Sequence, residues 1–307
     1  MDAAHLSRRF SYRTSLETAF GDPRLFQIFA LGSLLATGAW LRDFSLHPAQ
    51  IVLTFGAALA TQRLTWRFYP PAARSYRSAI ITALSLTLLL RADNLVVHPL
   101  AAAAAISSKS LVRIRGKHLF NPATFGIVVA LLLLPGSWVS PGQWGSDVAL
   151  AGWFIALGAL VTRRASRGDI SWSFLGFYLG AIALRVAWLG QRWAVWAHQL
   201  SSGALLLFAF FMISDPMTTP NRRAARIAHA AVVAAIAYTW QFSLYRTNGL
   251  IWALFAASFA VPLWDLAMPA PKFEWNQKGA TNEHIVIENS LEASNPAGGR
   301  DRIRSAA

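Results

Sequence analysis

The sequence predicts an all-α, polytopic membrane protein with about ten transmembrane helices, arranged in two similar halves with broken helices. Three observations support this prediction. The 307 residues are 55% hydrophobic and only 14% charged, with a mean hydropathy of +0.39, a composition typical of chains that span a bilayer. Arginine and lysine are concentrated in alternate loops between the apolar runs. Polar segments that contain proline interrupt the apolar pattern at two places, as broken membrane helices do.

The ten apolar runs are interpreted as ten crossings. Several are shorter than the about 20 residues that a straight span needs, so these must borrow flanking residues or be half-helices buried among neighbours. In chain order the runs are Leu25–Leu41, Pro48–Thr61, Ser78–Leu90, Leu95–Ile106, Phe125–Leu134, Val148–Val161, Ile170–Leu189, Ser202–Ile213, Ile227–Leu244 and Leu250–Leu266.

Three regions follow from this pattern. Residues 1–24 form a basic arm without the apolar core of a signal peptide. Residues 25–268 form the transmembrane domain. Residues 269–307 form a polar tail of mixed charge, which cannot bury enough apolar surface to fold alone and is expected to be disordered.

The loop charges predict the topology. The positive-inside rule places the basic loops and both termini in the cytoplasm and the chain in the inner (plasma) membrane. The four basic loops that follow the arm contain Arg63/Arg67/Arg74/Arg77, Lys109/Arg113/Arg115/Lys117, Arg163/Arg164/Arg167 and Arg222/Arg223/Arg226. Both interrupted segments then open on the cytoplasmic face.

Composition also excludes several functions. The chain has no cysteine, so it has no thiolate metal site, no iron–sulfur cluster and no thiol nucleophile. Its histidines are scattered without metal-ligand spacing, and no metal site is expected. The net charge of +14 lies in short loops between apolar runs, where it meets anionic lipid, so nucleic acid is not an expected partner. Redox chemistry would need an organic cofactor or haem.

The first interruption, which we call break 1, lies between residues 109 and 124. Asn121 is followed by Pro122, and the pair predicts a helix start with the asparagine as its cap. A helix N-terminus beside Lys117 and His118, with the Thr124 hydroxyl in its first turn, suits an anion such as a phosphate, a carboxylate or a reduced isoalloxazine. The alternative is a membrane helix that needs only a start signal and a basic anchor.

The second interruption, break 2, lies between residues 214 and 226. Asp215 ends an apolar run, where a carboxylate is costly unless it is paired or faces water. Thr218 and Thr219 follow it, and three nearby arginines, Arg222, Arg223 and Arg226, are its expected partners. The alternative is a salt-bridged turn. We further expect Asp215 to face Lys117, His118 or Arg226 across a cavity between the halves.

Both breaks carry a resemblance to a known family. Residues 116–123, Gly-Lys-His-Leu-Phe-Asn-Pro-Ala, and residues 215–220, Asp-Pro-Met-Thr-Thr-Pro, resemble segments of the RnfD/NqrB family, which unites a membrane component of the Rnf electron-transport complex with one of the sodium-pumping NADH:quinone reductase. The similarity extends from about residue 77 to about residue 237. Residues 91–94 and 138–145 also resemble a short branch found with enediyne biosynthesis proteins, the UnbU type.

The resemblance implies a cofactor, and one departure bears on it. Electron-transferring members carry flavin mononucleotide (FMN), joined through its phosphate to the threonine of Ser-Gly-Ala-Thr, on the outer side after the helix that follows Asn-Pro-Ala. Here Pro135–Asp147 contains no threonine, and Ser146 replaces the glutamate of the family's Gly-x-x-Gly-Glu segment. Covalent FMN is therefore not expected, and a noncovalent flavin or quinone is the alternative.

Three functions remain open. The first is an integral membrane subunit of an Rnf-like redox complex, with other membrane or redox subunits as partners. The second is a channel- or transporter-like conduit for a small solute or ion, and the third is a non-catalytic scaffold. No self-contained catalytic site is visible, so an enzyme activity of this chain alone is left undecided. The expected cofactor-binding residues are Lys117, His118, Asn121, Thr124, Asp215, Thr218, Thr219 and Arg226.

Overall fold

Each of the ten predicted apolar runs falls on a helix of the computed structural model, which describes residues 22–41, 47–69, 74–140, 144–145 and 147–273. The predicted arm up to residue 21 and the tail from residue 274 lie outside the described residues. The helices are α2 (Pro23–Leu41), α3 (Pro48–Thr65), α4 (Arg77–Leu89), α5 (Val97–Leu111), α6 (Pro122–Leu133), α7 (Val148–Arg164), α8 (Gly168–Trp188), α10 (Gly203–Leu207) with the π-helix η4 (Phe208–Met212), α11 (Arg223–Tyr238) with the π-helix η5 (Thr239–Ser243), and α12 (Gly249–Ser258) with α13 (Val261–Ala267).

The chain is an all-α polytopic membrane protein. In the described part, α2 and α8 are long and apolar enough to cross a bilayer by themselves. Two bent pairs reach the same length and apolarity only when their two parts are counted together: a short helix, α9 (Trp193–Leu200), with α10–η4, and α12 with α13, each bent by 46°. The shorter apolar helices α4 and α6 need flanking residues or neighbours to satisfy the same length, as the sequence predicts.

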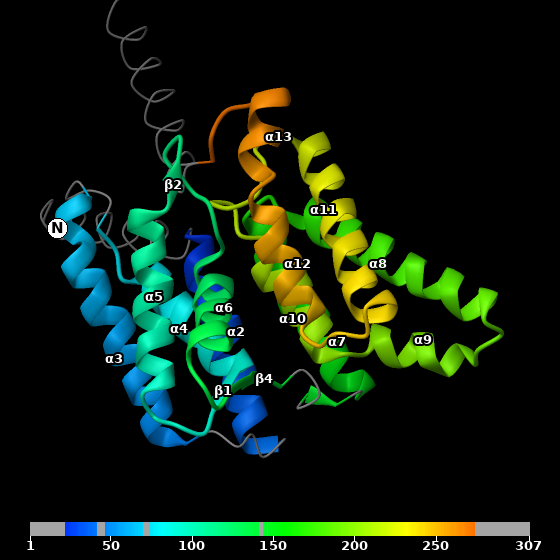
Figure 1. Ribbon diagram of the computed structural model, residues 1–307, viewed down its shortest axis with the longest axis horizontal. Coiled ribbons are helices and arrows are strands. Elements are labelled where there is room, and N and C mark those ends of the chain that lie inside the picture. Colours follow the sequence, from blue (N-terminus) through cyan, green and yellow to red (C-terminus); the bar gives the residue numbers. More distant parts are fainter. Residues whose placement is uncertain (1–21, 42–46, 70–73, 141–143, 146, 274–307) are drawn as a thin grey trace, which may run out of the picture. The chain divides into compact units, whose positions relative to one another are not determined.

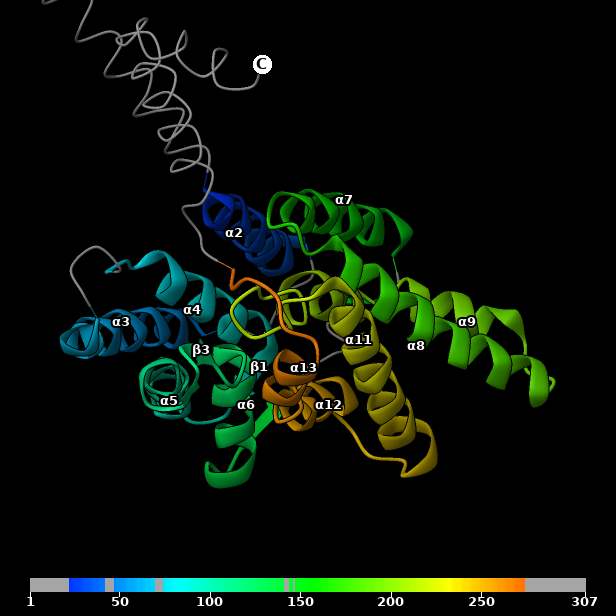
Figure 2. The same cartoon turned by 90° about the horizontal axis from the view of Figure 1, so that it is seen from above.

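The helices from Pro23 to Pro271 pack as two groups that share an interface (Figure 1). In one group, α3 and α6 pack on α5, while α2 and α3 pack on α4. In the other, α11 packs on α8 and α12. Contacts of α2 with α7 and of α6 with α12 join the groups, and Figure 2 shows both pairs side by side. Each group contains one helix–break–helix unit, α5–α6 and α10–α11.

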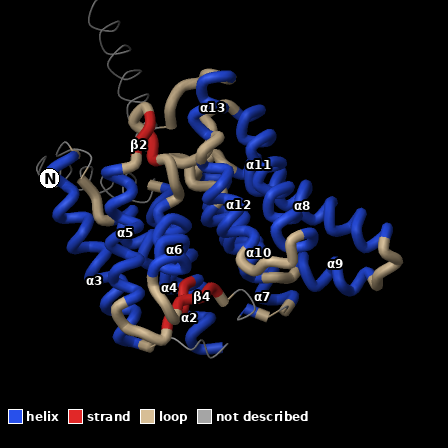
Figure 3. Tube along the Cα trace, in the orientation of Figure 1, coloured by secondary structure: helices blue, strands red, loops and turns tan. Residues whose placement is uncertain are grey.

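Two short antiparallel ribbons, coloured red in Figure 3, were not predicted. β1 (Leu90–Ala92) pairs with β4 (Ser137–Val139), and β2 (Arg113–Ile114) pairs with β3 (Lys117–His118). The β2–β3 hairpin turns on Arg115 and Gly116, whose φ angles are 52° and 82°. Positive φ at both central residues defines a type I′ turn, and glycine supplies it most easily at the second position. Break 1 is therefore an ordered hairpin.

The last predicted run, Leu250–Leu266, differs from the single helix expected. It is divided at Phe259 and Ala260 into α12 and α13, and Pro262 lies in the first turn of α13. Proline has no N–H and suits a helix start, because the first turn does not use that donor. The division turns the axis of α13, which carries Asp265, by 46° from that of α12.

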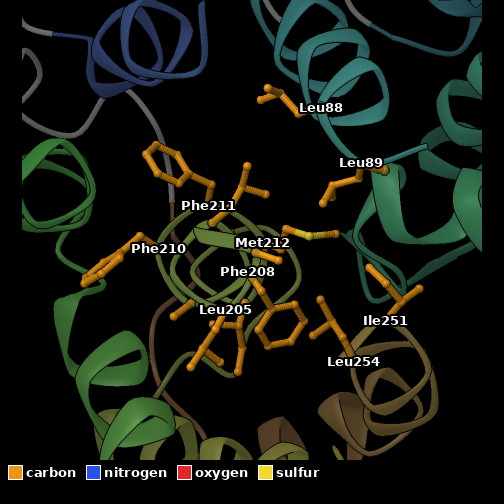
Figure 4. Packing of buried hydrophobic residues seen from close by; sticks show 14 of the residues in the cluster. Leu88, Leu89, Leu205, Phe208, Phe210, Phe211, Met212, Ile251 and Leu254 are labelled. Atoms are coloured by element: carbon orange, nitrogen blue, oxygen red, sulfur yellow. The ribbon is translucent and has the colours of Figure 1, made fainter. Parts of the chain in front are cut away.

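The centre of the domain is α10–η4, in which all ten residues are buried. In Figure 4, Phe208 and Met212 lie among Leu88 and Leu89 of α4 and Ile251 and Leu254 of α12. A helix that is apolar on every side belongs in a core, and here it is surrounded by both helix groups. Break 2 starts directly where this central helix ends.

Candidate functional site

Break 1 is tied to break 2 through the cap of α6. The Asn121 Oδ1 atom accepts hydrogen bonds from the Thr124 amide, at 3.1 Å, and from the Thr124 hydroxyl, at 3.4 Å. The predicted cap of the helix is therefore confirmed. The Asn121 Nδ2 atom donates to the Met212 carbonyl at 3.2 Å. One amide thus starts α6 and also holds the end of η4, 91 residues further along the chain.

Lys117 makes the second connection between the breaks. Its ammonium donates to the Thr219 carbonyl at 2.6 Å, to Asn221 Oδ1 at 3.2 Å and to Asp265 Oδ2 of α13 at 2.7 Å. An ammonium has three N–H donors, and all three are used here. The side chains of Lys117 and Asp265 are only 11% and 12% exposed, so the pair is largely removed from water.

Asn221 connects this ion pair to a second one. The backbone N–H of Asn221 donates to Asp265 Oδ1 at 2.8 Å, while its backbone carbonyl accepts from Arg226 Nη1 at 2.5 Å. Arg226 in turn donates to Asp169 of α8 from both Nε and Nη2, at 2.9 and 2.6 Å to Oδ2. We call these five residues, Lys117, Asp265, Asn221, Arg226 and Asp169, the junction network. It fastens β3, break 2, α8, α11 and α13 together.

The predicted partners of Asp215 were wrong. Arg222 and Arg223 are exposed, and Arg226 is paired with Asp169. The Asp215 Oδ1 atom instead accepts from the amide of Met217 at 3.0 Å, which caps the turn of break 2. The expectation that Asp215 faces Lys117 directly is likewise corrected, because the carboxylate bonded to Lys117 is that of Asp265. The pairing differs because α13 and α8 bring their own carboxylates to the cations.

Asp215 nevertheless lies close to a second set of cations. The charges of Lys109 and Arg167 act on its carboxyl group, and so does that of Lys117. Lys109 lies in the last turn of α5, is 4% exposed and donates to Gln62 Oε1 of α3 at 3.0 Å. Burial raises the pKa of Asp215, and the Met217 amide and these cations oppose that shift.

The other titrating groups of the two breaks are also shifted by burial. Burial lowers the pKa of Lys117, and the hydrogen bond and charge of Asp265 oppose this shift. Burial, followed by the charges of Lys109 and Arg113, lowers the pKa of His118 to about 3. His118 is therefore neutral at physiological pH.

A few buried polar atoms beside the junction network have no protein partner in the described part. They are the Thr219 hydroxyl, His118 Nδ1 and, on α11, His229 Nδ1. Thr219 and His229 are 2% and 1% exposed. Buried polar atoms of this kind are rare and mark positions where water or a ligand group could bind. Since the donors of Lys117 are taken, these three atoms are among the described groups that could bond to a ligand.

The structure thus brings most of the predicted site residues to one end of the domain but gives them different tasks. Lys117, Asn121, Thr124 and Arg226 bond to other protein groups, and the Thr218 hydroxyl donates to the Asp215 carbonyl at 3.4 Å. His118 and Thr219 keep free capacity. The sequence interpretation missed Asp169, Asn221 and Asp265. Asp265 had a usable signal, because it is the carboxylate within the last apolar run.

A cavity lies at the opposite end of the domain, beside β1 and β4. Its volume is about 460 Å³, within the range of small-molecule sites, and Trp138 of β4 forms part of its wall. Gln50 also lines it and fixes β1 by donating from Nε2 to the Ala92 carbonyl at 2.7 Å. The lining residues are His47, Gln50, Arg91, Ala92, Asp93, Leu95 and Trp138.

Comparison with known proteins finds the same family, over a range that includes break 2. The sequence profile of the NQR2, RnfD, RnfE family matches residues 137–273. The D subunit of the ion-translocating oxidoreductase complex of Cronobacter sakazakii is 28% identical over 155 residues, which are 49% of this chain and 41% of that protein. The protein of the same name from Citrobacter koseri is 24% identical over 324 aligned positions, which cover 80% of this chain and 86% of the relative. The first alignment thus spans less than half of that relative's length.

Proposed function

Because the chain is a distant relative of the NQR2, RnfD, RnfE family, we propose that it is the integral membrane subunit of an Rnf-like electron-transport complex. The observation that carries the proposal is the way the two family-like segments fold onto each other. Lys117 of one reaches Thr219 and Asn221 of the other, and Asn121 reaches the end of η4. These hydrogen bonds require both segments. Other membrane or redox subunits would be its partners, and the bacterial inner membrane its location.

The cofactor we propose is a noncovalent flavin or quinone. A flat ring with carbonyl and N–H or O–H groups fits the free capacity beside the junction network, where the Thr219 hydroxyl can donate and the neutral His118 Nδ1 can accept. Such a group would supply one- or two-electron chemistry that this cysteine-free chain lacks. Asp215 would offset part of the positive charge that Lys109 and Arg167 contribute there.

The cavity beside β4 is the second candidate position for the same cofactor. It follows α6, as the flavin position of electron-transferring members follows the helix after Asn-Pro-Ala. Trp138 could stack on a ring there, and the Gln50 side chain could hydrogen-bond to it. Since Pro135–Asp147 contains no threonine, any flavin in this cavity would be bound without a phosphoester link.

The packing of the domain gives little support to the conduit. A path across the membrane between the two helix groups would have to pass α10–η4, whose Phe208, Phe210 and Met212 side chains are each 1% exposed or less. Interiors filled at this density leave no room for a solute without rearrangement. The redox role is therefore preferred over a channel.

The test is the absorbance spectrum of the gently purified native protein. A flavin band would be expected to disappear in the pair Thr219→Val and His118→Gln if the ring lies at the junction, and in Gln50→Leu with Trp138→Leu if it lies in the cavity. Denaturing electrophoresis should give no fluorescent band, because the acceptor threonine is missing. A protein free of flavin, quinone and haem in every preparation would contradict the cofactor proposal and favour the scaffold.

The proposed topology has its own test. With both termini in the cytoplasm, reporter fusions after Leu46 and after Arg167 should lie on opposite sides of the membrane. Signals from the same side would refute the ten-span arrangement.

A further inference from the structure

Arginines and aromatic rings from two separate loops gather on one surface of the first helix group. The surface comprises the end of α3, the 3-10 helix η1 (Trp66–Phe68) with Tyr69 after it, Arg74 before the start of α4, and the β2–β3 hairpin. We propose that it binds the phosphate groups of anionic phospholipids at the bilayer surface. We call it the arginine–aromatic surface; its members are Arg63, Arg67, Arg74, Arg113, Trp66, Phe68 and Tyr69.

Three of its guanidinium groups lie over aromatic rings. Arg63 lies 5.1 Å from the ring centroid of Trp66, and Arg67 lies 4.8 Å from that of Phe68. Arg113 of the hairpin lies 5.4 Å from that of Tyr69. A guanidinium stacked on a ring is held in place while the N–H donors at its edge stay available, and that fork matches two phosphate oxygens. Stacking therefore leaves the N–H donors of these arginines oriented to bind two oxygens of one phosphate group.

Tyr69 joins the two loops. Its hydroxyl donates to the Lys109 carbonyl at the end of α5, at 3.1 Å, and accepts from the Ser110 hydroxyl at 3.3 Å. Arg74 donates from Nε to the Tyr69 carbonyl at 3.3 Å. The hydroxyl thus fixes η1 beside the hairpin, so that arginines from both loops, far apart in the sequence, act on one patch. The two loops therefore form one surface, although in the sequence they are separate.

The surface has no acidic counterpart in the described part of the chain. None of Arg63, Arg67, Arg74 and Arg113 forms an ion pair with a described residue. Between residues 47 and 140 the sequence contains a single carboxylate, that of Asp93, which lies beside β1 at the other end of the helices. Arg226, in contrast, is neutralised by Asp169. An excess of positive charge at a membrane edge is complementary to an anionic leaflet, which attracts clustered arginines.

The neighbouring apolar residues favour a lipid as the source of that phosphate. Leu64 at the end of α3 and Leu111 at the end of α5 are 72% and 70% exposed, and Phe68 is 51% exposed. They lie next to the arginines along the helices, so a phosphate held by the arginines would bring acyl chains against the leucines. Aromatic rings at the boundary are typical of the headgroup region. A free phosphate would leave this apolar surface without a partner.

The experiment titrates the purified full-length protein in detergent with diphosphatidylglycerol or with phosphatidylcholine and measures the shift in thermal unfolding. The wild-type protein should bind the anionic lipid at least tenfold more tightly than the zwitterionic one. The triple variant Arg63→Gln/Arg67→Gln/Arg113→Gln should lose this preference. The matched control, Arg163→Gln/Arg222→Gln/Arg223→Gln, removes the same charge from exposed arginines of the other helix group and should keep it.

Three outcomes would overturn the proposal: an equal loss in the control, a triple variant that keeps the preference, or stabilisation by inorganic phosphate alone that matches the lipid. If the glutamine variant does not fold, the charge-conserving Arg→Lys triple variant takes its place. It should lose part of the preference, because lysine lacks the bidentate fork. Full retention in the lysine variant would refute the role of the stacked guanidinium groups.

Discussion

The two breaks look alike in sequence but satisfy their charges in opposite ways. Break 1 contributes a cation, Lys117, whose three donors all reach groups outside its own hairpin. Break 2 contributes a carboxylate, Asp215, which accepts a hydrogen bond from the backbone two residues away. Break 1 is therefore defined by its distant contacts, whereas the carboxylate of break 2 mainly shapes its own turn.

This difference explains why nearness in the sequence was a poor guide to ion pairing. Arg226 lies in the same break as Asp215, yet it pairs with Asp169, 57 positions away on α8. The helix ends that meet in space therefore decide which charges pair. Substitutions in the two breaks should therefore differ in how much they lower the free energy of unfolding.

The largest effect is expected from Asp265→Asn. It leaves the Lys117 ammonium buried without its counter-charge, which typically costs about 3–5 kcal/mol. Asp215→Asn keeps an Oδ1 acceptor for the Met217 amide and should cost about 1 kcal/mol or less. The measurement is the free energy of unfolding of both variants in mixed micelles of one composition. A larger loss for Asp215→Asn would reverse the comparison between the breaks.

A double-mutant cycle sharpens the same point. Lys117→Gln combined with Asp265→Asn should be non-additive by about 1–3 kcal/mol, because the two groups are in direct contact. Lys117→Gln combined with Asp215→Asn should be less strongly coupled than the first pair, because no hydrogen bond joins the two groups and only their charges interact. Strong coupling in the second pair would mean that the breaks share one charged cavity, as the sequence had suggested.

Asn121 tests the cap of break 1. Asn121→Ala removes the acceptor for the Thr124 amide and should destabilise the protein by about 0.5–2 kcal/mol. Asn121→Asp serves as the matched control, since it keeps that acceptor but loses the donor to the Met212 carbonyl. A smaller loss in Asn121→Asp would assign the main effect to the cap. Equal losses would assign it to the bond between the breaks.

The smallest effect concerns pH and His118. The pKa of His118 is lowered from 6.5 to about 3 in the folded protein, so the unfolded chain binds a proton below pH 6.5 while the folded protein does not. The contribution of His118 to stability should therefore fall as the pH decreases below about 6.5, by about 1 kcal/mol by pH 5.5. His118→Gln should flatten this part of the stability curve. An unchanged curve in that variant would assign the pH dependence to other groups.

Composition and local chemistry determined the fold class, the ten helical runs and the start of α6. Membrane insertion depends on apolar length, and a cap depends on residues three positions apart, so both can be read from neighbouring residues. The helix α9, the bend before α13 and the two ribbons were not predicted. They depend on how short segments pack against neighbouring helices, which hydropathy does not encode.

The candidate site was likewise predicted only in part from the sequence. The sequence alone identified both breaks and placed Lys117, His118, Asn121 and Thr219 within them. Only the tertiary structure decided that Lys117 meets Asp265, 148 positions away, and that Tyr69 brings Arg113 to the end of α3. The reason is physical: a buried charge must find its partner wherever helix packing delivers one, and packing is a property of the whole domain.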